Sequence, residues 1–286
     1  MRGATDCHVH VFGPYQRFPL PPDRPYTPAE ARVAELRAMH AALGIERAVV
    51  VAASPYGTDN GALLDALAAL GEGGRGVVAI DAAAISDDEL RAMNAAGVRG
   101  ARVNLASVGA ADPGAAEAAL RATAERVAPL GWHVDLHASL DVTAALHDAI
   151  AAAPAPTVVD HFGYADPGAG AEQPGFAALR ALAAAGRAYV KLSAPERLPG
   201  VDPENPGVAA LARALLEAGP DNVVWASDWP HTGGGPHGGG ARDASEVEPF
   251  RAIDDARALE RLRSWTRDEA ELRRVLVDNP ARLYGF

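Results

Sequence analysis

Short runs rich in valine and isoleucine recur eight times along the chain, and each is followed by a longer segment rich in alanine, leucine, arginine and glutamate. Such runs predict buried strands, and apolar residues that step by three or four between them predict helices. The predicted strands are residues 5–12, 47–53, 76–81, 100–105, 133–137, 157–161, 188–193 and 223–229. The predicted helices are residues 28–43, 60–70, 87–96, 115–130, 141–152, 176–185, 208–218 and 258–284. Strands and helices that alternate in this way give parallel strands joined by right-handed crossovers.

Eight strand–helix units are the number that a closed α/β barrel needs, and 286 residues suit one such domain. We therefore predict a single (β/α)8 TIM barrel over residues 1–286, with long loops after the first strand (13–28) and the eighth (230–249). The last helical segment is expected to seal the outside of the barrel. A doubly wound open sheet has the same local pattern and is the alternative. The count of eight and the polar residues at many strand ends favour the barrel.

The charge and cysteine content argue against several classes of protein. The chain has 26 Lys+Arg and 37 Asp+Glu, which give a formal net charge of −11 at pH 7. This charge argues against nucleic acid and against an anionic membrane surface as partners. Cys7 is the only cysteine, which rules out an internal disulfide and suits a reducing compartment. Neither a secretory signal nor an apolar run of about 18 residues is recognisable, so we expect a cytoplasmic protein.

Two histidines near the end of the first predicted strand point to metal chemistry. His8 and His10 are two residues apart, so a strand places both side chains on the face toward the barrel interior. The same periodicity predicts that Cys7 and Val9 face outward. Two imidazoles spaced in this way can bind one metal ion, although such pairs also occur by chance.

Three more residues with suitable chemistry end other predicted strands: His137 ends the fifth, His161 the sixth and Asp228 the eighth. The carboxyl ends of the strands form the active face of a barrel, so these side chains are expected to converge there. A buried Asp228 beside imidazoles or a cation could take a proton from water. A helix cap or a salt bridge is the alternative role for this carboxylate.

Cationic and hydroxyl side chains lie near the same strand ends. Arg102 in the fourth predicted strand and Arg197 after the seventh could hold a substrate carboxylate, because guanidinium binds carboxylate in a bidentate fork. Lys191 is either a third cation of the site or a side chain that reaches up from the lower half of the barrel. Tyr26 and Ser54 supply hydroxyls, and plain turn chemistry is an equal alternative for both.

The chain resembles the amidohydrolase superfamily, and within it the branch of 2-pyrone-4,6-dicarboxylate lactonase-like enzymes, over nearly its whole length. The segments that carry the resemblance are DCHVHVFGP, RFPLPPDRPYTP, SPYGTDN, GARVNL, GWHVDLH, VVDHFG, VKLSAPERL, WASDWPH and VDNPARLYGF. The resemblance implies a (β/α)8 barrel that hydrolyses a lactone with an activated water. It also implies catalytic positions for His8, His10, His161 and Asp228, and substrate-contacting positions for Tyr26, Ser54, Arg102 and Arg197.

Departures from the pyrone dicarboxylate lactonase bear on the substrate. That enzyme has an arginine soon after its fourth strand, where residues 105–109 here read LASVG, and a second arginine at the position of Tyr164. Two fewer guanidinium groups weaken the clamp for a second carboxylate. We therefore expect a lactone with one negative charge, or fewer, rather than the pyrone dicarboxylate.

A further departure bears on the metal. The pyrone lactonase works without a divalent ion and has tyrosine at the position of His137, whereas the sulfomuconolactone and sugar lactonases of the branch are metal-dependent. His137 restores a histidine common in metal-binding amidohydrolases. The resemblance thus implies one divalent ion, held by His8, His10, His137 and Asp228. We favour Zn²⁺, with Mn²⁺ and metal-free catalysis as alternatives.

The predicted reaction is the opening of a small anionic lactone by water, because the chain lacks a GxSxG nucleophile motif and Cys7 is expected to face away from the site. Asp228 would take the proton of the water, and His161 and the metal would stabilise the oxyanion. A metal-dependent decarboxylase of an unsaturated carboxylic acid is the alternative, followed by a barrel that only binds a small acid. A homo-oligomer is compatible with the sequence.

Overall fold

Eight parallel strands form the central sheet of the computed structural model, which describes residues 1–105, 112–200, 202–233 and 244–286. In sheet order they are β1 (Thr5–Val9), β3 (Arg47–Val51), β4 (Gly74–Val78), β5 (Val98–Asn104), β6 (His133–His137), β7 (Thr157–Val159), β8 (Ala188–Ser193) and β9 (Val223–Ala226). Two hydrogen bonds join the first strand to the chain beyond the last: the Asp228 N–H donates to the His8 carbonyl at 3.0 Å, and the His10 N–H donates to the Trp229 carbonyl at 2.8 Å. The predicted (β/α)8 barrel is confirmed, and the open sheet is wrong.

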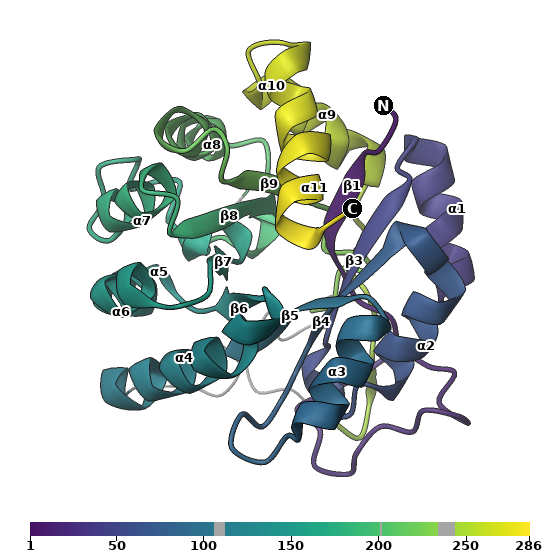
Figure 1. Ribbon diagram of the computed structural model, residues 1–286. Coiled ribbons are helices and arrows are strands. Elements are labelled where there is room, and N and C mark those ends of the chain that lie inside the picture. Colours follow the sequence, from purple (N-terminus) through teal and green to yellow (C-terminus); the bar gives the residue numbers. More distant parts are fainter. Residues whose placement is uncertain (106–111, 201, 234–243) are drawn as a thin grey trace.

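Helices surround the strands in a ring (Figure 1). They are α1 (Val33–Leu43), α2 (Gly61–Leu70), α3 (Asp87–Ala95), α4 (Pro113–Val127), α5 (Leu140–Ala145), α6 (His147–Ala152), α7 (Phe176–Ala184) and α8 (Pro206–Ala218). The segment predicted as one helix over 141–152 is divided into α5 and α6, because the backbone leaves the helical region at Leu146 (φ −86°, ψ 5°).

The C-terminal segment, predicted as one helix over 258–284, is also divided. Helix α9 (Asp255–Trp265) ends before Thr266, and α10 (Glu269–Arg273) begins after Asp268. The Asp268 side chain accepts a hydrogen bond from the N–H of Glu271, and this cap starts the new helix. A π-helical turn (Arg274–Asp278) then leads into α11 (Asn279–Tyr284).

Strand residues alternate between two buried clusters. One cluster packs the strands against the surrounding helices, for example Val50 and Leu136 with Leu36 and Leu120. The other consists of Cys7, Val49, Val51, Val77, Val158, Tyr189, Val224, Ala226 and Tyr284. Apart from Tyr284, it contains no buried helix residue. Its member on β8, Tyr189, is in phase with Lys191, and its members on β9, Val224 and Ala226, are in phase with Asp228. We conclude that this second cluster fills the interior of the barrel.

Two members of the interior cluster differ from expectation. Cys7 was predicted to face outward, and this is wrong: the register between β1 and β3 shifts between Asp6 and Val9, and the bulge turns Cys7 inward together with His8. Tyr284, at the end of α11, also joins the cluster. Its carbonyl accepts a hydrogen bond from Arg75 near the start of β4. The C-terminal segment therefore closes the amino end of the barrel and does not only cover its outside.

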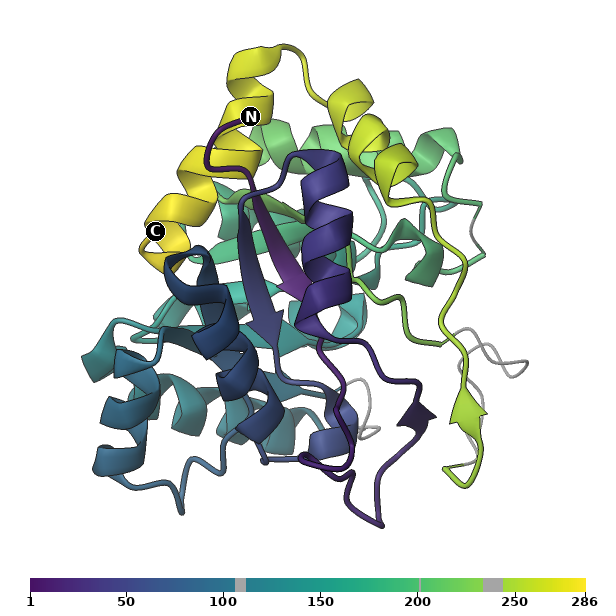
Figure 2. The same ribbon diagram turned by 90° about the vertical axis from the view of Figure 1, so that its right-hand side faces the viewer.

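The two long loops form one structure. β2 (Thr27–Pro28), in the loop after β1, pairs in parallel with β10 (Val247–Glu248), in the loop after β9. Figure 2 shows this two-stranded ribbon at the lower right, apart from the ring of helices. The glycine-rich residues 234–243 of the second loop lie outside the described residues. The predicted loops are thus present and lie side by side.

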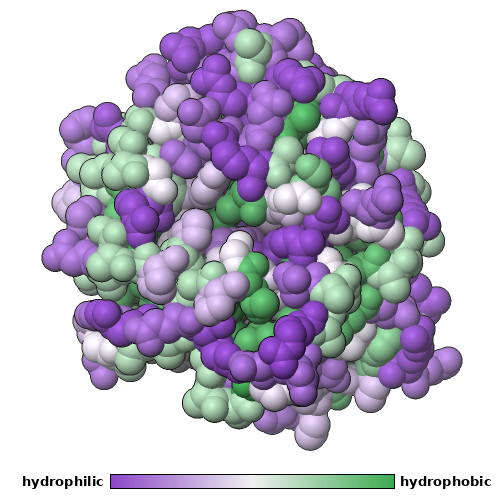
Figure 3. Space-filling model, viewed as in Figure 1, coloured by the Kyte–Doolittle hydropathy of each residue, from purple (hydrophilic) through white to green (hydrophobic). Residues whose placement is uncertain are grey.

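In the described ranges, no helix has the length and apolarity that a bilayer span requires. On the face seen in Figure 3, hydrophilic residues cover most of the surface and hydrophobic residues lie between them in small groups. This face of the described chain therefore carries no broad apolar patch.

Candidate active site

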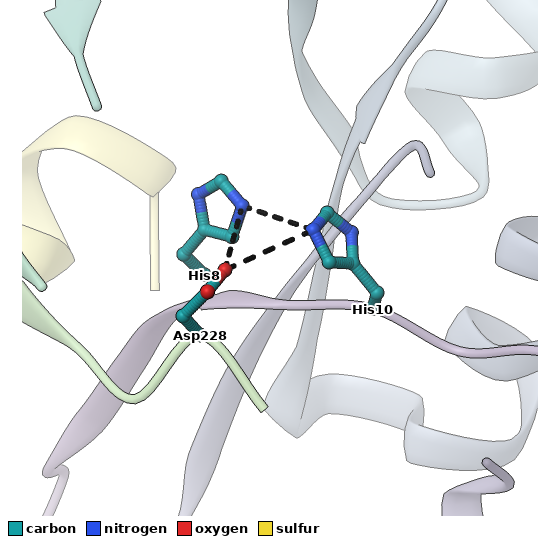
Figure 4. Close-up of side chains that lie close together, drawn as sticks. All are labelled: His8, His10 and Asp228. Atoms are coloured by element: carbon teal, nitrogen blue, oxygen red, sulfur yellow. Dashed lines mark hydrogen bonds and ion pairs between the residues drawn. The ribbon is translucent and has the colours of Figure 1, made fainter. Parts of the chain in front are cut away.

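One carboxylate oxygen lies among three histidine rings at the carboxyl end of the barrel. Oδ1 of Asp228 is 3.8 Å from Nε2 of His8, 4.0 Å from Nε2 of His10 and 3.9 Å from Nε2 of His161. Figure 4 shows how His8, His10 and Asp228 face one another. All four side chains are buried. The structure therefore brings together the four residues for which the sequence predicted catalytic roles.

Left-handed backbone conformations direct the side chains of Asp228 and His161 into the site. Asp228 has φ 67° and His161 has φ 48°, and Ala194, directly after β8, has φ 46°. A residue other than glycine costs about 1–2 kcal/mol in this region, and such residues cluster at functional sites. Here they turn the chain at the ends of β7, β8 and β9, and the turn at β7 brings His161 into the site.

Two of the rings are fixed through their second nitrogen. Nδ1 of His10 donates to the Val51 carbonyl at 2.8 Å, and Nδ1 of His161 lies 2.8 Å from Oγ of Ser193. Because a carbonyl can only accept, the neutral His10 ring has an unprotonated Nε2. Burial lowers the pKa of His10 to about 4 and that of His161 to about 3, so both rings are neutral at pH 7.

A buried charge network lies beneath His8. The Lys191 ammonium contacts Asp135, lies 2.9 Å from Oδ1 of Asp160, and lies 3.0 Å from Nδ1 of His8. Arg102 places Nη2 3.2 Å from Oδ2 of Asp160. Burial by itself lowers the pKa of Lys191, but the two carboxylates raise it above its usual value. Two cations and two carboxylates therefore balance in a region that water does not reach.

Arg197 holds Asp228 in its ionised form. Nε of Arg197 donates to Oδ2 of Asp228 at 2.5 Å, and its Nη2 donates to Oγ1 of Thr232 at 2.9 Å. Burial on its own raises the pKa of Asp228, but Arg197, followed by His161 and His8, holds it well below its usual range. Oδ1 consequently faces the three rings as a charged acceptor, while Oδ2 is occupied.

The predicted substrate-contacting residues divide into two places. Arg197 lines an open cleft of about 940 Å³ together with Tyr164, Phe250 and Arg251, and Tyr26 is close enough to interact with Arg197 electrostatically.

Arg102 and Ser54 are not among the described residues that line this cleft. The Arg102 side chain is buried and turned toward Asp160, and Ser54 accepts a hydrogen bond from Nδ2 of Asn104 at 2.9 Å. Of these four residues, only Arg197 is among the described residues that line the cleft.

His137 stands apart from the other predicted metal ligands. Its Nδ1 lies 3.3 Å from Oδ2 of Asp160, and its Nε2 lies 3.2 Å from the Tyr164 hydroxyl. Both ring nitrogens thus have partners. Among the described residues, the structure groups His8 and His10 with Asp228 as candidate ligands but does not include His137.

The donor set of His8, His10 and Asp228 fits one divalent cation. Nε2 of His8 and Nε2 of His10 are 3.3 Å apart, about the separation of two ligands on a tetrahedral zinc ion with Zn–N bonds near 2.0–2.1 Å. Both carry no proton in the tautomers that donate from Nδ1, so a cation between them would relieve their repulsion.

A second group of closely spaced donors, His8, Asp160 and His161, is less suitable. The Lys191 ammonium already lies about 3 Å from Nδ1 of His8 and from Oδ1 of Asp160, so it occupies the position of a cation there.

Sequence reasoning missed Asp135 and Asp160. Asp135 precedes His137 by two residues on β6, so it shares the inward phase that was used for the histidines, and Asp160 shares the phase of Val158 on β7. The period-two pattern could have placed both inside the barrel. It could not have said that they hold Lys191 and Arg102.

A family model described as Amidohydrolase matches residues 5–286. The chain belongs to the amidohydrolase family. This amidohydrolase is 34% identical to a 4-sulfomuconolactone hydrolase from Rhizobium radiobacter over 289 residues, which cover 99% of this chain and 90% of the relative. It is 36% identical to a 2-pyrone-4,6-dicarboxylate hydrolase from Comamonas testosteroni over 292 residues, with the same shares of the two chains.

Solved structures share the fold of this chain. The amidohydrolase superposes on an apo crystal structure from Agrobacterium tumefaciens with a TM-score of 0.84 and 28% identity, over 100% of this chain and 97% of the other. It shares the fold of an amidohydrolase from Burkholderia multivorans determined with bound Zn, with a TM-score of 0.71, 20% identity and 99% of each chain covered.

Proposed function

We propose that this enzyme hydrolyses a small anionic lactone. One observation carries the proposal: the ionised Oδ1 of Asp228 lies within 4.0 Å of three imidazole nitrogens, an arrangement that could hold and deprotonate a water molecule. The two curated relatives described above are both named as hydrolases of lactone-type substrates, which supports the same reaction class.

The side chains of this site have distinct tasks in such a reaction. Asp228 accepts the proton of the attacking water at Oδ1, since Arg197 already occupies Oδ2. His161 faces the same oxygen from the end of β7 and, with its proton on Nε2, is placed to stabilise negative charge on the carbonyl oxygen, after which Asp228 returns the proton to the leaving alkoxide. The hydrogen bond of His161 to Ser193 fixes the ring during this step.

We further propose that one divalent cation, Zn²⁺ in preference to Mn²⁺, is held by His8, His10 and Asp228. A bound divalent ion would supply Lewis acidity and lower the pKa of a water ligand. His137 remains a proposed ligand only if its ring is released from Asp160 and Tyr164. The spacing of the two histidine Nε2 atoms supports the choice of the first three residues.

The cleft beside the site supports an anionic substrate. Two guanidinium groups line it, those of Arg197 and Arg251, and Arg251 donates to the carbonyls of Gly233 and Glu196. Tyr164 stands at the position where the pyrone lactonase has a further arginine. A phenol can donate one hydrogen bond but carries no charge to pair with a second carboxylate. Arg102 and Ser54 remain proposed substrate contacts outside this cleft.

We also propose that the reaction takes place in the cytoplasm, and the single buried cysteine supports this compartment.

A panel of lactones assayed with a pH indicator, with and without Zn²⁺ or Mn²⁺, tests this function. We expect proton release with anionic lactones and a loss of activity after chelation that added metal restores. Substituting Asp228→Asn should lower kcat/KM by about 10²- to 10⁴-fold, the usual contribution of a general base.

Asp221→Asn is the control and should leave the rate unchanged, because this exposed aspartate precedes β9 at the amino end of the strand, opposite the end that carries Asp228. Near-normal turnover by Asp228→Asn would contradict the assigned role. Release of CO₂ instead of a ring-opened acid would favour the decarboxylase alternative.

A further inference from the structure

We propose that Asp160 is a positioning residue that sets the tautomers of His8 and His137 together, so that both rings present an unprotonated Nε2 to the site. The inference deepens the proposed function, because it concerns how the site prepares His8 for a cation or a water molecule. It does not depend on which lactone is the substrate.

The geometry divides the two carboxylate oxygens of Asp160 between the two rings. Oδ1 lies 3.1 Å from Nδ1 of His8, and Oδ2 lies 3.3 Å from Nδ1 of His137. An ionised carboxylate can only accept hydrogen bonds, so each short contact requires a proton on Nδ1. A neutral imidazole with its proton on Nδ1 has a free lone pair on Nε2.

The outer contacts of both rings agree with this assignment. In Figure 4, the His8 nitrogen that bears no dashed line points away from His10, while Nε2 faces His10 and Asp228. Nε2 of His137 lies 3.2 Å from the Tyr164 hydroxyl, which can donate to a free lone pair. The buried carboxylate of Asp160 would thereby leave Nε2 of His8 and Nε2 of His137 as hydrogen-bond acceptors that face the site.

Lys191 competes with Asp160 for His8. Its ammonium is 3.0 Å from Nδ1 of His8 and 2.9 Å from Oδ1 of Asp160, so the three atoms form a nearly equilateral triangle. An ammonium can only donate, and a hydrogen bond from Lys191 to Nδ1 would leave the ring proton on Nε2, in the way of a cation. The tautomer of His8 is therefore decided between one donor and one acceptor, and Nδ1 has no other hydrogen-bond partner among the described side chains.

Asp135 offers a matched control for this role. Like Asp160, it is fully buried, contacts Lys191 and lies near Arg102, with Oδ1 3.9 Å from Nε of Arg102. Unlike Asp160, it has no hydrogen bond to either histidine among the described contacts. Asp135→Asn and Asp160→Asn therefore remove the same charge from the same network, and only the second removes an acceptor from the two rings.

Zinc affinity, measured by competition with a chromophoric chelator, distinguishes the two variants without any substrate. We expect Asp160→Asn to weaken Zn²⁺ binding by about 10- to 100-fold, the usual effect of losing the partner of a metal-binding histidine. Asp135→Asn should change the affinity by less than about threefold. Equal losses in both variants would mean that only the charge balance matters and would overturn the proposal.

Nitrogen-15 NMR of the histidine rings in the unsubstituted protein gives a second readout that does not depend on whether a variant folds or zinc binds. We expect His8 and His137 to show a protonated Nδ1 and an unprotonated Nε2. A proton on Nε2 of His8 would assign Nδ1 to Lys191 and refute the proposal. If these results hold but no lactone is opened, the proposed function fails while the role of Asp160 stands.

Discussion

At the scale of single residues, burial keeps the histidines of the site neutral, whereas a neighbouring cation keeps Asp228 charged. His10 and His161 are buried, and their pKa values fall because burial dominates. Asp228 is equally buried, yet its pKa is held below the usual range because Arg197 contacts it directly. The site thus combines neutral imidazoles with a charged carboxylate at the same pH.

Replacing Arg197 by glutamine should show that the low pKa of Asp228 depends on the guanidinium group. Without the guanidinium, burial raises the pKa of Asp228, so protonation of this base should begin at higher pH. We expect the acid limb of the kcat/KM profile to move upward in pH. The loss of a charge-assisted hydrogen bond, about 1.5–3 kcal/mol, corresponds to a fall of about 10- to 150-fold at pH 7. Arg257→Gln, on the exposed surface of α9, is the control. An unshifted acid limb would contradict this role of Arg197.

Residue identity and period-two spacing were enough to predict that His8, His10, His161 and Asp228 meet. The spacing failed at Cys7, because a bulge in β1 cannot be read from alternation alone. It also gave no partner for Lys191, since periodicity defines the face of a strand and not the contacts across the barrel. His161 was expected as a strand residue, but it reaches the site through a left-handed turn after β7.

At the scale of elements, a buried carboxylate ties α10 to α8. Oε2 of Glu271 accepts from Nη1 of Arg213 at 2.8 Å and from the N–H of Arg267 at 2.7 Å, and Oε1 lies 2.9 Å from Nη2 of Arg267. Burial raises the pKa of Glu271, but these donors lower it below its usual value. The anchor therefore depends on the ionised form of this side chain.

Substituting Glu271→Gln should lower the free energy of unfolding at pH 7 by about 1.5–3 kcal/mol, the range for hydrogen bonds to a charged group. Because the pKa of Glu271 is lower in the folded state, its contribution is present above its unfolded pKa and is lost as the pH falls through the folded pKa. Urea unfolding at pH 7 and at about pH 3 should therefore give a difference between the two proteins that narrows in acid. Glu260 forms an exposed ion pair with Arg257 on α9, so Glu260→Gln is the control and should change the free energy of unfolding by less than about 1 kcal/mol. A difference that stays constant with pH would contradict the assignment.

Element order could be predicted better than element length. The boundaries of β6 and β8 are as predicted, because His133–His137 and Ala188–Ser193 are bounded by clear turn signals. The predicted C-terminal helix spans a break at residues 266–268, where the cap of Asp268 overrides a continuous apolar pattern. Helical periodicity on both sides of such a break looks the same as in one long helix.

At the scale of the whole molecule, the interior of the barrel is apolar near its amino end and charged near the site. The apolar part includes Cys7, whose thiol is fully buried and whose pKa is raised well above its usual value, chiefly by burial. Only opening of the barrel would expose this sulfur, so the rate at which the Cys7 thiol reacts measures how often the barrel opens.

Alkylation of Cys7 by iodoacetamide should be at least about 10³-fold slower in the native protein than in urea, given a stability of several kcal/mol. Added Zn²⁺ should slow it further, because a ligand that binds only the folded state stabilises that state. Ser264→Cys, with a thiol on the exposed surface of α9, should react quickly in the native protein and serves as the control. Rapid labelling of native Cys7 would show that the barrel opens locally.

The hydrogen bonds that join the two ends of the sheet are made by the backbone of His8, His10, Asp228 and Trp229. The seam of the barrel and its reacting centre are therefore the same place. If the chain were cut at any loop between β1 and β9, one fragment would carry the imidazoles of His8 and His10 and the other would carry the carboxylate of Asp228. Turnover would then appear only on recombination of the pieces, which makes catalysis itself an assay for ring closure.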